Sequence, residues 1–155
     1  KQKDLVKAVK GMLADNSKLS KQLERFQKNM LSVIARNLEQ KLEIVGTFSL
    51  AVSKVEVDDP AHLRDLAFQV KSRYPRVSLI LGAEVEGKAH LAILLVPDAI
   101  DNYGLNASTL IREVSREIQG GGGGQPFFAT AGGKHPAGID KALERARRMV
   151  VDAVG

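Results

Sequence analysis

The first third of the chain carries a hydrophobic stripe with the spacing of a long helix. From Leu5 onwards the stripe recurs at alternating intervals of four and three residues, with Lys, Gln and Glu between. This heptad spacing predicts a helix that buries one narrow face, the seam, against another helix. The seam consists of Leu5, Val9, Met12, Asn16, Leu19, Leu23 and Phe26, and continues to Met30 and Val33.

Two features of the seam leave alternatives open. Near Met30 the apolar face shifts to other positions, which predicts a stutter, a bend or a second helix there. Asn16 is polar, so it either selects register or oligomeric state or belongs to a frayed, solvated patch. An exposed apolar seam is marginal in water. We therefore expect it to associate with another copy of the chain, with a later helix of the same arm, or with another domain of a longer protein.

From Gly46 onwards the pattern changes, which marks a second region. Residues 47–55 alternate like a half-buried strand, and Asp59-Pro60 begins a helix that Pro75 stops. We expect a β-hairpin at residues 77–96 and a helix at residues 106–118, capped by Asn106 or Ser108. A short strand at residues 127–131 and a closing helix at residues 136–154 follow.

The prediction for the whole chain is therefore an α+β fold in two parts. Residues 1–45 form a long, coiled-coil-like helical arm, which dimerises or packs against another helix. Residues 46–155 form a small mixed α/β domain of order β-α-β-β-α-β-α, which is long enough to bury a workable core.

Charge divides along the chain in the same way. Residues 1–45 hold ten Lys and Arg against five Asp and Glu, whereas residues 46–155 hold thirteen of each, so the net charge of +5 lies in the arm. A basic arm attracts polyanions such as nucleic acid, although a basic helix face is more often simply solvated.

Other features restrict the class of protein. The chain has no Cys, which excludes a disulfide framework and a thiolate zinc site and favours a reducing compartment. Its longest apolar run, residues 91–97, is far below the roughly 20 residues that cross a bilayer. We expect a soluble, cytoplasmic protein that has no membrane partner. Because the chain begins without an initiator Met or a signal peptide, we interpret it as a piece of a longer protein.

The most informative segment is a loop of five consecutive glycines, Gly120–Gly124. Ordering such a run is entropically costly, so it requires positive φ angles, a close approach of another backbone, or amides directed at an anion. A flexible linker is the alternative, but a linker does not need the Gly132-Gly133 pair that follows. Neither the P-loop pattern nor the dinucleotide-binding pattern fits this segment, so ATP binding is not expected.

The run GGGGGQPFFATAGG at residues 120–133, with the basic helix of residues 141–151 behind it, resembles the segment that closes bacterial alanyl-tRNA synthetases. The arm and the strand order fit the same region, so the resemblance covers the whole chain. It implies a non-catalytic, DHH-associated type of domain that holds the outer corner of tRNA(Ala) for aminoacylation and editing by other domains. The parent would be an ATP-dependent ligase that uses ATP, Mg²⁺ and Zn²⁺, while this fragment would need no cofactor or metal.

The RNA-binding residues expected from this resemblance are the glycines, which contact RNA through their backbone, and nearby polar or basic side chains. A side chain at Gly122 or Gly123 should obstruct RNA without unfolding the domain. Phe127 and Phe128 are either core residues or stacking platforms. The full set is Gly120, Gly121, Gly122, Gly123, Gly124, Gln125, Arg112, Arg116, Lys134, His135, Arg145 and Arg148.

Two other functions remain open at this stage. The same domain type accompanies DHH-family phosphoesterases, where it binds substrate and the glycine run ends in a His; here Gln125 stands at that place. The chain could also serve mainly as an oligomerisation element through its seam. His62 and His90 are interpreted as structural residues.

Overall fold

The computed structural model describes residues 2–155 and divides into two compact units after Val33. The hydrophobic pattern placed the division at residue 45. The structure assigns the last turns of the first helix to the second unit, because Ala35 and Leu38 are fully buried there.

The first helix, α1 (Gln2–Glu39), is continuous, which excludes the second helix among the alternatives expected near Met30. Its sequence contains no Pro and one Gly, so nothing in it interrupts the backbone hydrogen bonds of a helix. The shift of the apolar face near Met30 marks the point where packing begins. Up to Val33 the seam is exposed, with Leu5 at 67% and Phe26 at 62% of full exposure.

The second unit contains all the helices and strands expected from its sequence and three additional elements. Its elements are β1 (Glu43–Val45), β2 (Phe48–Lys54), α2 (Ala61–Arg73), β3 (Val77–Val85), β4 (Lys88–Leu94), α3 (Pro97–Tyr103), α4 (Ala107–Val114), the 3₁₀ turn η1 (Ser115–Ile118), β5 (Gly120–Gly124), β6 (Phe128–Gly133), the 3₁₀ turn η2 (Pro136–Gly138) and α5 (Ile139–Val154). Relative to the expected order, the structure adds β1, α3 and β5. The last of these is the glycine run, which is a strand rather than a loop.

The strands form a single six-stranded sheet of order β1-β2-β3-β4-β6-β5. Strands β2 and β3 are parallel and are joined through α2, whereas all other neighbours are antiparallel. The central strand β3 is buried at every position except Glu84, as a strand covered on both faces should be. The glycine strand β5 lies at one edge of the sheet.

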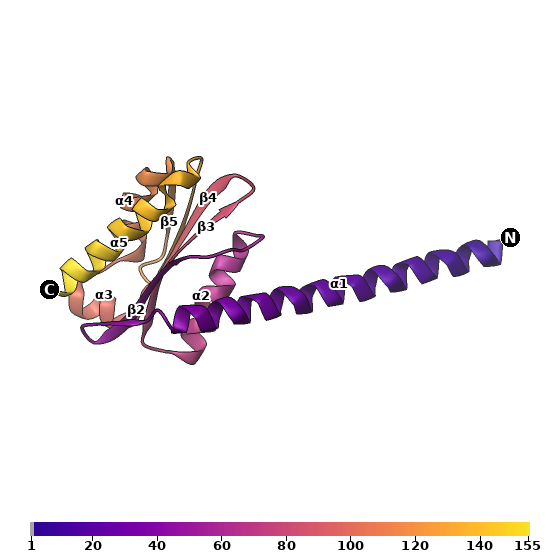
Figure 1. Cartoon of the computed structure of the whole chain (residues 1–155), viewed down its shortest axis with the longest axis horizontal. Helices are drawn as coiled ribbons and strands as arrows, with labels where there is room; N and C mark the ends of the chain where they lie inside the picture. Colours follow the sequence, from indigo (N-terminus) through magenta and orange to yellow (C-terminus); the bar gives the residue numbers. More distant parts are fainter. Residues whose placement is uncertain (1) are drawn as a thin grey trace. The chain divides into compact units, whose positions relative to one another are not determined.

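Helices cover the two faces of the sheet unequally (Figure 1). Leu91 and Ile93 of β4 pack into a core with α4 and α5, so these helices cover one face. Because strand neighbours face opposite ways, His90 and Ala92 point to the other face, where α2 packs against β3 and β4. On that side the surface of β6 and β5 extends beyond α2, and this is where the candidate site lies.

No helix within residues 2–155 has both the length and the apolar character needed to cross a membrane.

Candidate nucleic-acid interface

The two faces of the glycine strand β5 are unlike. A Cβ atom at Gly122 would lie 2.6 Å from Cα of Ala131 and would collide with the carbonyl oxygen of Thr130. At Gly121 or Gly123 a Cβ would meet nothing within 4 Å. The close approach of β6 therefore requires glycine at 120, 122 and 124, whereas Gly121 and Gly123 leave a backbone face without side chains, the bare face of β5.

The turn between β5 and β6 is held in place by backbone hydrogen bonds. Gln125 N–H donates to the carbonyl oxygen of Phe128 at 2.8 Å, and Leu95 N–H donates to that of Phe127 at 2.8 Å. The two aromatic residues consequently take different places. Phe128 is buried and its ring centroid lies 5.3 Å from that of Phe68 in α2, whereas Phe127 is 44% exposed.

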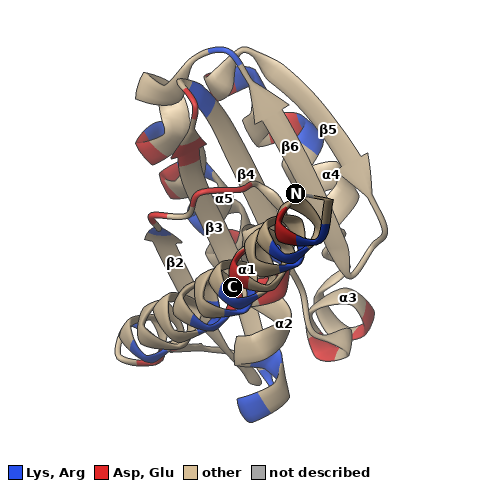
Figure 2. Ribbon diagram, turned by 90° about the vertical axis from the view of Figure 1, so that its right-hand side faces the viewer, with Lys and Arg blue, Asp and Glu red and all other residues tan. Residues whose placement is uncertain are grey.

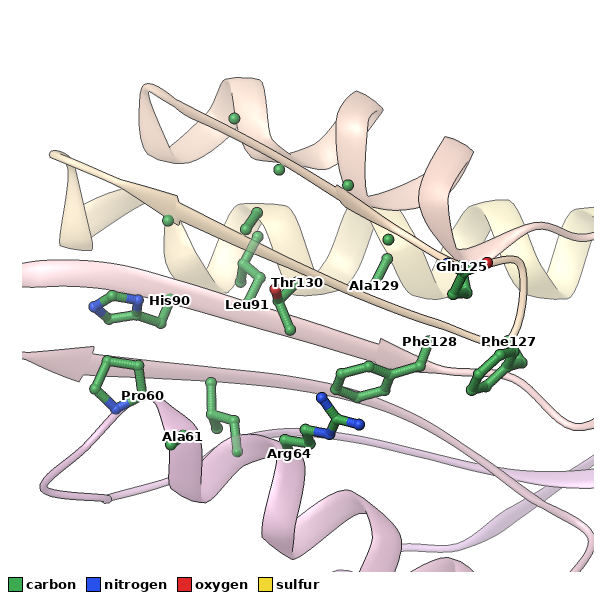
Figure 3. A pocket seen from close by; sticks show the side chains of 17 residues that line it. Pro60, Ala61, Arg64, His90, Leu91, Gln125, Phe127, Phe128, Ala129 and Thr130 are labelled. Carbon is green, nitrogen blue, oxygen red and sulfur yellow. The ribbon is translucent and has the colours of Figure 1, made fainter.

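A pocket of about 730 Å³ lies over the bare face of β5. Its floor is the backbone of residues 121–124 together with β6, and its opposite wall is the beginning of α2 (Figure 3). The polar side chains that line it are few: Arg64, His90, Gln125 and Thr130. The rest of the lining is glycine backbone and apolar side chains, which suits a flat ligand that is apolar on its faces and polar at its edge.

Arg64 is the cation of this pocket. Its guanidinium carbon lies 5.6 Å from the ring centroid of Phe68 and 5.7 Å from that of Phe128. Both distances fall within the range of cation–π attraction. Figure 3 shows the side chain reaching from α2 toward the ring of Phe128.

His90 lies on β4 at the other end of the pocket. Partial burial lowers the pKa of its imidazole, the nearby charge of Lys88 lowers this pKa further, and Asp59 acts in the opposite direction. The neutral imidazole is thus favoured, and it can both donate and accept a hydrogen bond. Within residues 2–155 no three His, Cys, Asp or Glu side chains gather closely enough to hold a metal ion.

The structure brings part of the expected RNA-binding set together and disperses the rest. Gly121, Gly122, Gly123, Gly124 and Gln125 line the pocket, whereas Gly120 pairs with Gly133 outside it. The expected cations and His135 are elsewhere on the second unit. Those outside the pocket lining are Arg112 of α4, Arg116 of η1, Lys134 and His135 after β6, and Arg145 and Arg148 of α5.

Two of these cations are engaged with carboxylates. Arg145 donates to Glu113 Oε2 at 3.0 Å and to the Glu113 carbonyl oxygen at 3.1 Å, and it lies 3.4 Å from Glu117 Oε1. This arrangement ties α5 to α4 and η1. Arg148 pairs with Glu144 of its own helix at 3.2 Å and is 73% exposed. Arg145 therefore links elements of the fold and Arg148 is the more exposed of the two, and contact of either with RNA stays a prediction.

Sequence reasoning missed Arg64, and it interpreted His90 as structural without linking it to the glycines. Arg64 precedes the glycine run by more than fifty residues, and no motif spacing connects them. The sheet order β4-β6-β5 and the packing of α2 beside β4 bring them together.

Comparisons with known proteins agree on one family. The DHHA1 domain family matches residues 47–152. The chain is 38% identical over 148 residues to an alanine--tRNA ligase of Cytophaga hutchinsonii, covering 96% of this chain, and 34% identical over 148 residues to that of Lacticaseibacillus paracasei, again covering 96%. In both cases it spans 17% of the relative's length.

A solved structure shows the same fold. The C-Ala domain from Aquifex aeolicus alanyl-tRNA synthetase superimposes with a TM-score of 0.62 at 30% sequence identity. The match covers 72% of this chain and 98% of that domain.

Proposed function

This chain belongs to the DHHA1 domain family, in the form that bacterial alanyl-tRNA synthetases carry as their C-terminal domain, and from that premise we propose that it binds tRNA(Ala). Its role is to hold the outer corner of the tRNA while other domains of the parent aminoacylate and edit it. The parent is proposed to be an alanine--tRNA ligase that uses ATP, Mg²⁺ and Zn²⁺, and the fragment itself to be non-catalytic and cytoplasmic.

The observation that carries this proposal is the bare face of β5. Gly121 and Gly123 present backbone without side chains to a pocket that also contains Arg64. Proteins recognise folded RNA through its shape, its phosphates and its unstacked bases. A flat glycine floor lets bases or sugars approach the peptide planes more closely than any side chain would permit.

The arm contributes charge to the same function. Figure 2 shows Lys and Arg along α1. In the sequence of this helix they outnumber Asp and Glu. Such charge adds attraction to RNA that does not depend on base sequence and that weakens with salt. We propose that the arm strengthens binding while the pocket sets its geometry.

The decisive test is a valine at Gly123. Its Cβ would project into the pocket without a clash, because a Cβ at this position meets nothing within 4 Å. Valine also suits a strand better than glycine does, so the melting transition should be unchanged or slightly raised. We expect Gly123→Val to weaken tRNA(Ala) binding about tenfold or more, corresponding to at least ~1.4 kcal/mol, in a titration with labelled tRNA.

Gly122→Val and Gly11→Ala are the controls. At Gly122 the new side chain would push β5 away from β6, so this variant should unfold at lower temperature; this corrects the expectation that the domain would tolerate it. At Gly11 the added methyl meets nothing within 4 Å and lies in the arm, so tRNA affinity should not fall. Parent-like tRNA affinity of a folded Gly123→Val variant would show that β5 does not contact RNA.

A further inference from the structure

Arg64 is held by aromatic rings from two different elements. Phe68 lies one turn further along α2, and Phe128 comes from β6, across the sheet. Both ring centroids lie within 6 Å of the guanidinium carbon, and the two rings also contact each other. This restricts the side chain to an orientation beside the pocket before any ligand arrives, which lowers the entropy lost on binding.

Within residues 2–155 the guanidinium of Arg64 contacts aromatic rings and donates no hydrogen bond to another side chain or to the backbone. In the described part of the chain Arg64 forms no ion pair, in contrast to Arg145 and Arg147. The aromatic contacts engage the π face of a guanidinium, while its N–H donors lie in the plane of the group. Those donors are therefore free to meet a pair of acceptors in the pocket.

The pocket favours a nucleobase over a phosphate as the source of these acceptors. Apart from Arg64, the lining consists of the glycine floor, of apolar residues such as Phe127 and Phe128, and of the uncharged polar side chains of Gln125 and Thr130, with His90 at the other end. A phosphate would lose much of its hydration there and gain one cation, which is unfavourable. A base has apolar faces that stack on flat surfaces and carries its polar groups at the edge, where Arg64 lies.

Among the bases, guanine matches the donor geometry of arginine. Its O6 and N7 atoms accept two parallel hydrogen bonds from one guanidinium, whereas adenine presents a donor beside N7. We propose that Arg64 recognises the O6/N7 edge of a guanine that enters the pocket and stacks on the glycine floor. This inference rests on the proposed RNA-binding function and names the specificity-determining residue of its site.

The test compares Arg64→Gln with Lys71→Gln in the full 155-residue chain. Lys71 is a matched control, because its Nζ atom also lies 5.6 Å from the Phe68 ring centroid, on the same helix, but it does not line the pocket. We expect Arg64→Gln to weaken tRNA(Ala) binding by between about 5-fold and 150-fold, as is typical of a bidentate base contact. Lys71→Gln should bind like the parent at matched ionic strength.

Base preference and salt dependence identify the contact. The RNAs UGUGUG and UAUAUA are used as competitors against labelled tRNA. UGUGUG should displace the labelled tRNA from the parent protein at a lower concentration than UAUAUA does. In Arg64→Gln this preference should disappear. The salt slope, which is the slope of the logarithm of the binding constant against the logarithm of the salt concentration, should not change. Arg64→Lys keeps the charge and the aromatic contact, so it should remain folded and still lose the preference.

Each other outcome overturns a different statement. If Arg64→Gln reduces the salt slope by about one and weakens both RNAs equally, Arg64 binds a phosphate and the guanine assignment is wrong. If Gly123→Val weakens tRNA binding but Arg64→Gln does not, the inference fails and the proposed function stands. If the parent binds tRNA(Ala) and neither variant changes its affinity, the pocket is not the RNA site; if the parent itself does not bind tRNA(Ala), the proposed function fails.

Discussion

At the scale of single residues, the structure shows which arginines form ion pairs that connect elements of the domain. Arg147 donates to both carboxylate oxygens of Glu43, at 3.0 and 3.1 Å, and this hydrogen bonding raises the pKa of Arg147. The pair connects α5 to β1. Arg145 is similarly committed to Glu113 of α4. Neither pairing is visible in the sequence, because the partners are far apart along the chain, and Arg145 was for this reason assigned to RNA.

We expect His90 to make the stability of the fold depend on pH. Its pKa is lowered in the folded protein from the ordinary value of 6.5, mainly by burial, so the unfolded chain binds a proton more readily than the folded one. The free energy of unfolding should therefore decrease as pH falls below about 6.5, and this contribution should be fully present at higher pH. His90→Asn should flatten that part of the profile, measured by urea denaturation between pH 5 and 8. An identical slope in parent and variant would show that His90 is not responsible.

At the scale of elements, local signals predicted the helices and the central strands well. The hairpin expected at residues 77–96 forms as β3 and β4, and Pro75 follows the helix α2 as expected. The glycine run was misjudged as a loop, because glycine has little intrinsic preference for strands. It becomes a strand through its pairing with β6, whose Ala129 and Ala131 leave room for a backbone at close range.

The helix α4, which packs against β5, depends on its N-cap. The side chain of Asn106 accepts hydrogen bonds from the backbone N–H groups of Ser108 at 2.9 Å and Thr109 at 3.3 Å. Replacing it by Ala leaves these donors unsatisfied and should cost about 1 kcal/mol of stability. Thermal melting should show a decrease of a few degrees for Asn106→Ala, whereas Asn106→Asp, which keeps an acceptor, should resemble the parent. Equal melting temperatures for all three proteins would contradict the capping role.

At the scale of the whole molecule, the arm exposes an apolar seam for which we expect a partner. Its seam residues up to Val33 are exposed, and α1 is one continuous helix, so a later helix of the same arm is not available to cover them. Two of the expected partners remain: a second copy of the chain and another domain of the parent synthetase. Heptad spacing favours a second copy.

We therefore expect the chain to dimerise through the seam at micromolar concentration. Leu19→Asp combined with Leu23→Asp should give a monomer with reduced helicity, because charged residues cannot be buried at facing seam positions. Ala14→Asp combined with Ser17→Asp adds the same charge away from the seam and should leave the mass unchanged. Sedimentation equilibrium distinguishes these outcomes, and a monomeric parent chain would exclude self-association through the arm.

The sequence by itself determined the helical arm, most strands, the glycine run and, through that run, the family. These features follow from the spacing of neighbouring residues, since helix and strand periodicity, capping and turn chemistry act over a few positions. The tertiary structure alone decided which glycines are bare, which arginines are paired, and that Arg64 shares a pocket with β5. The reason is that strand order and helix packing join residues that are distant along the chain, and no local preference encodes which side of a glycine strand faces its neighbour and which remains open.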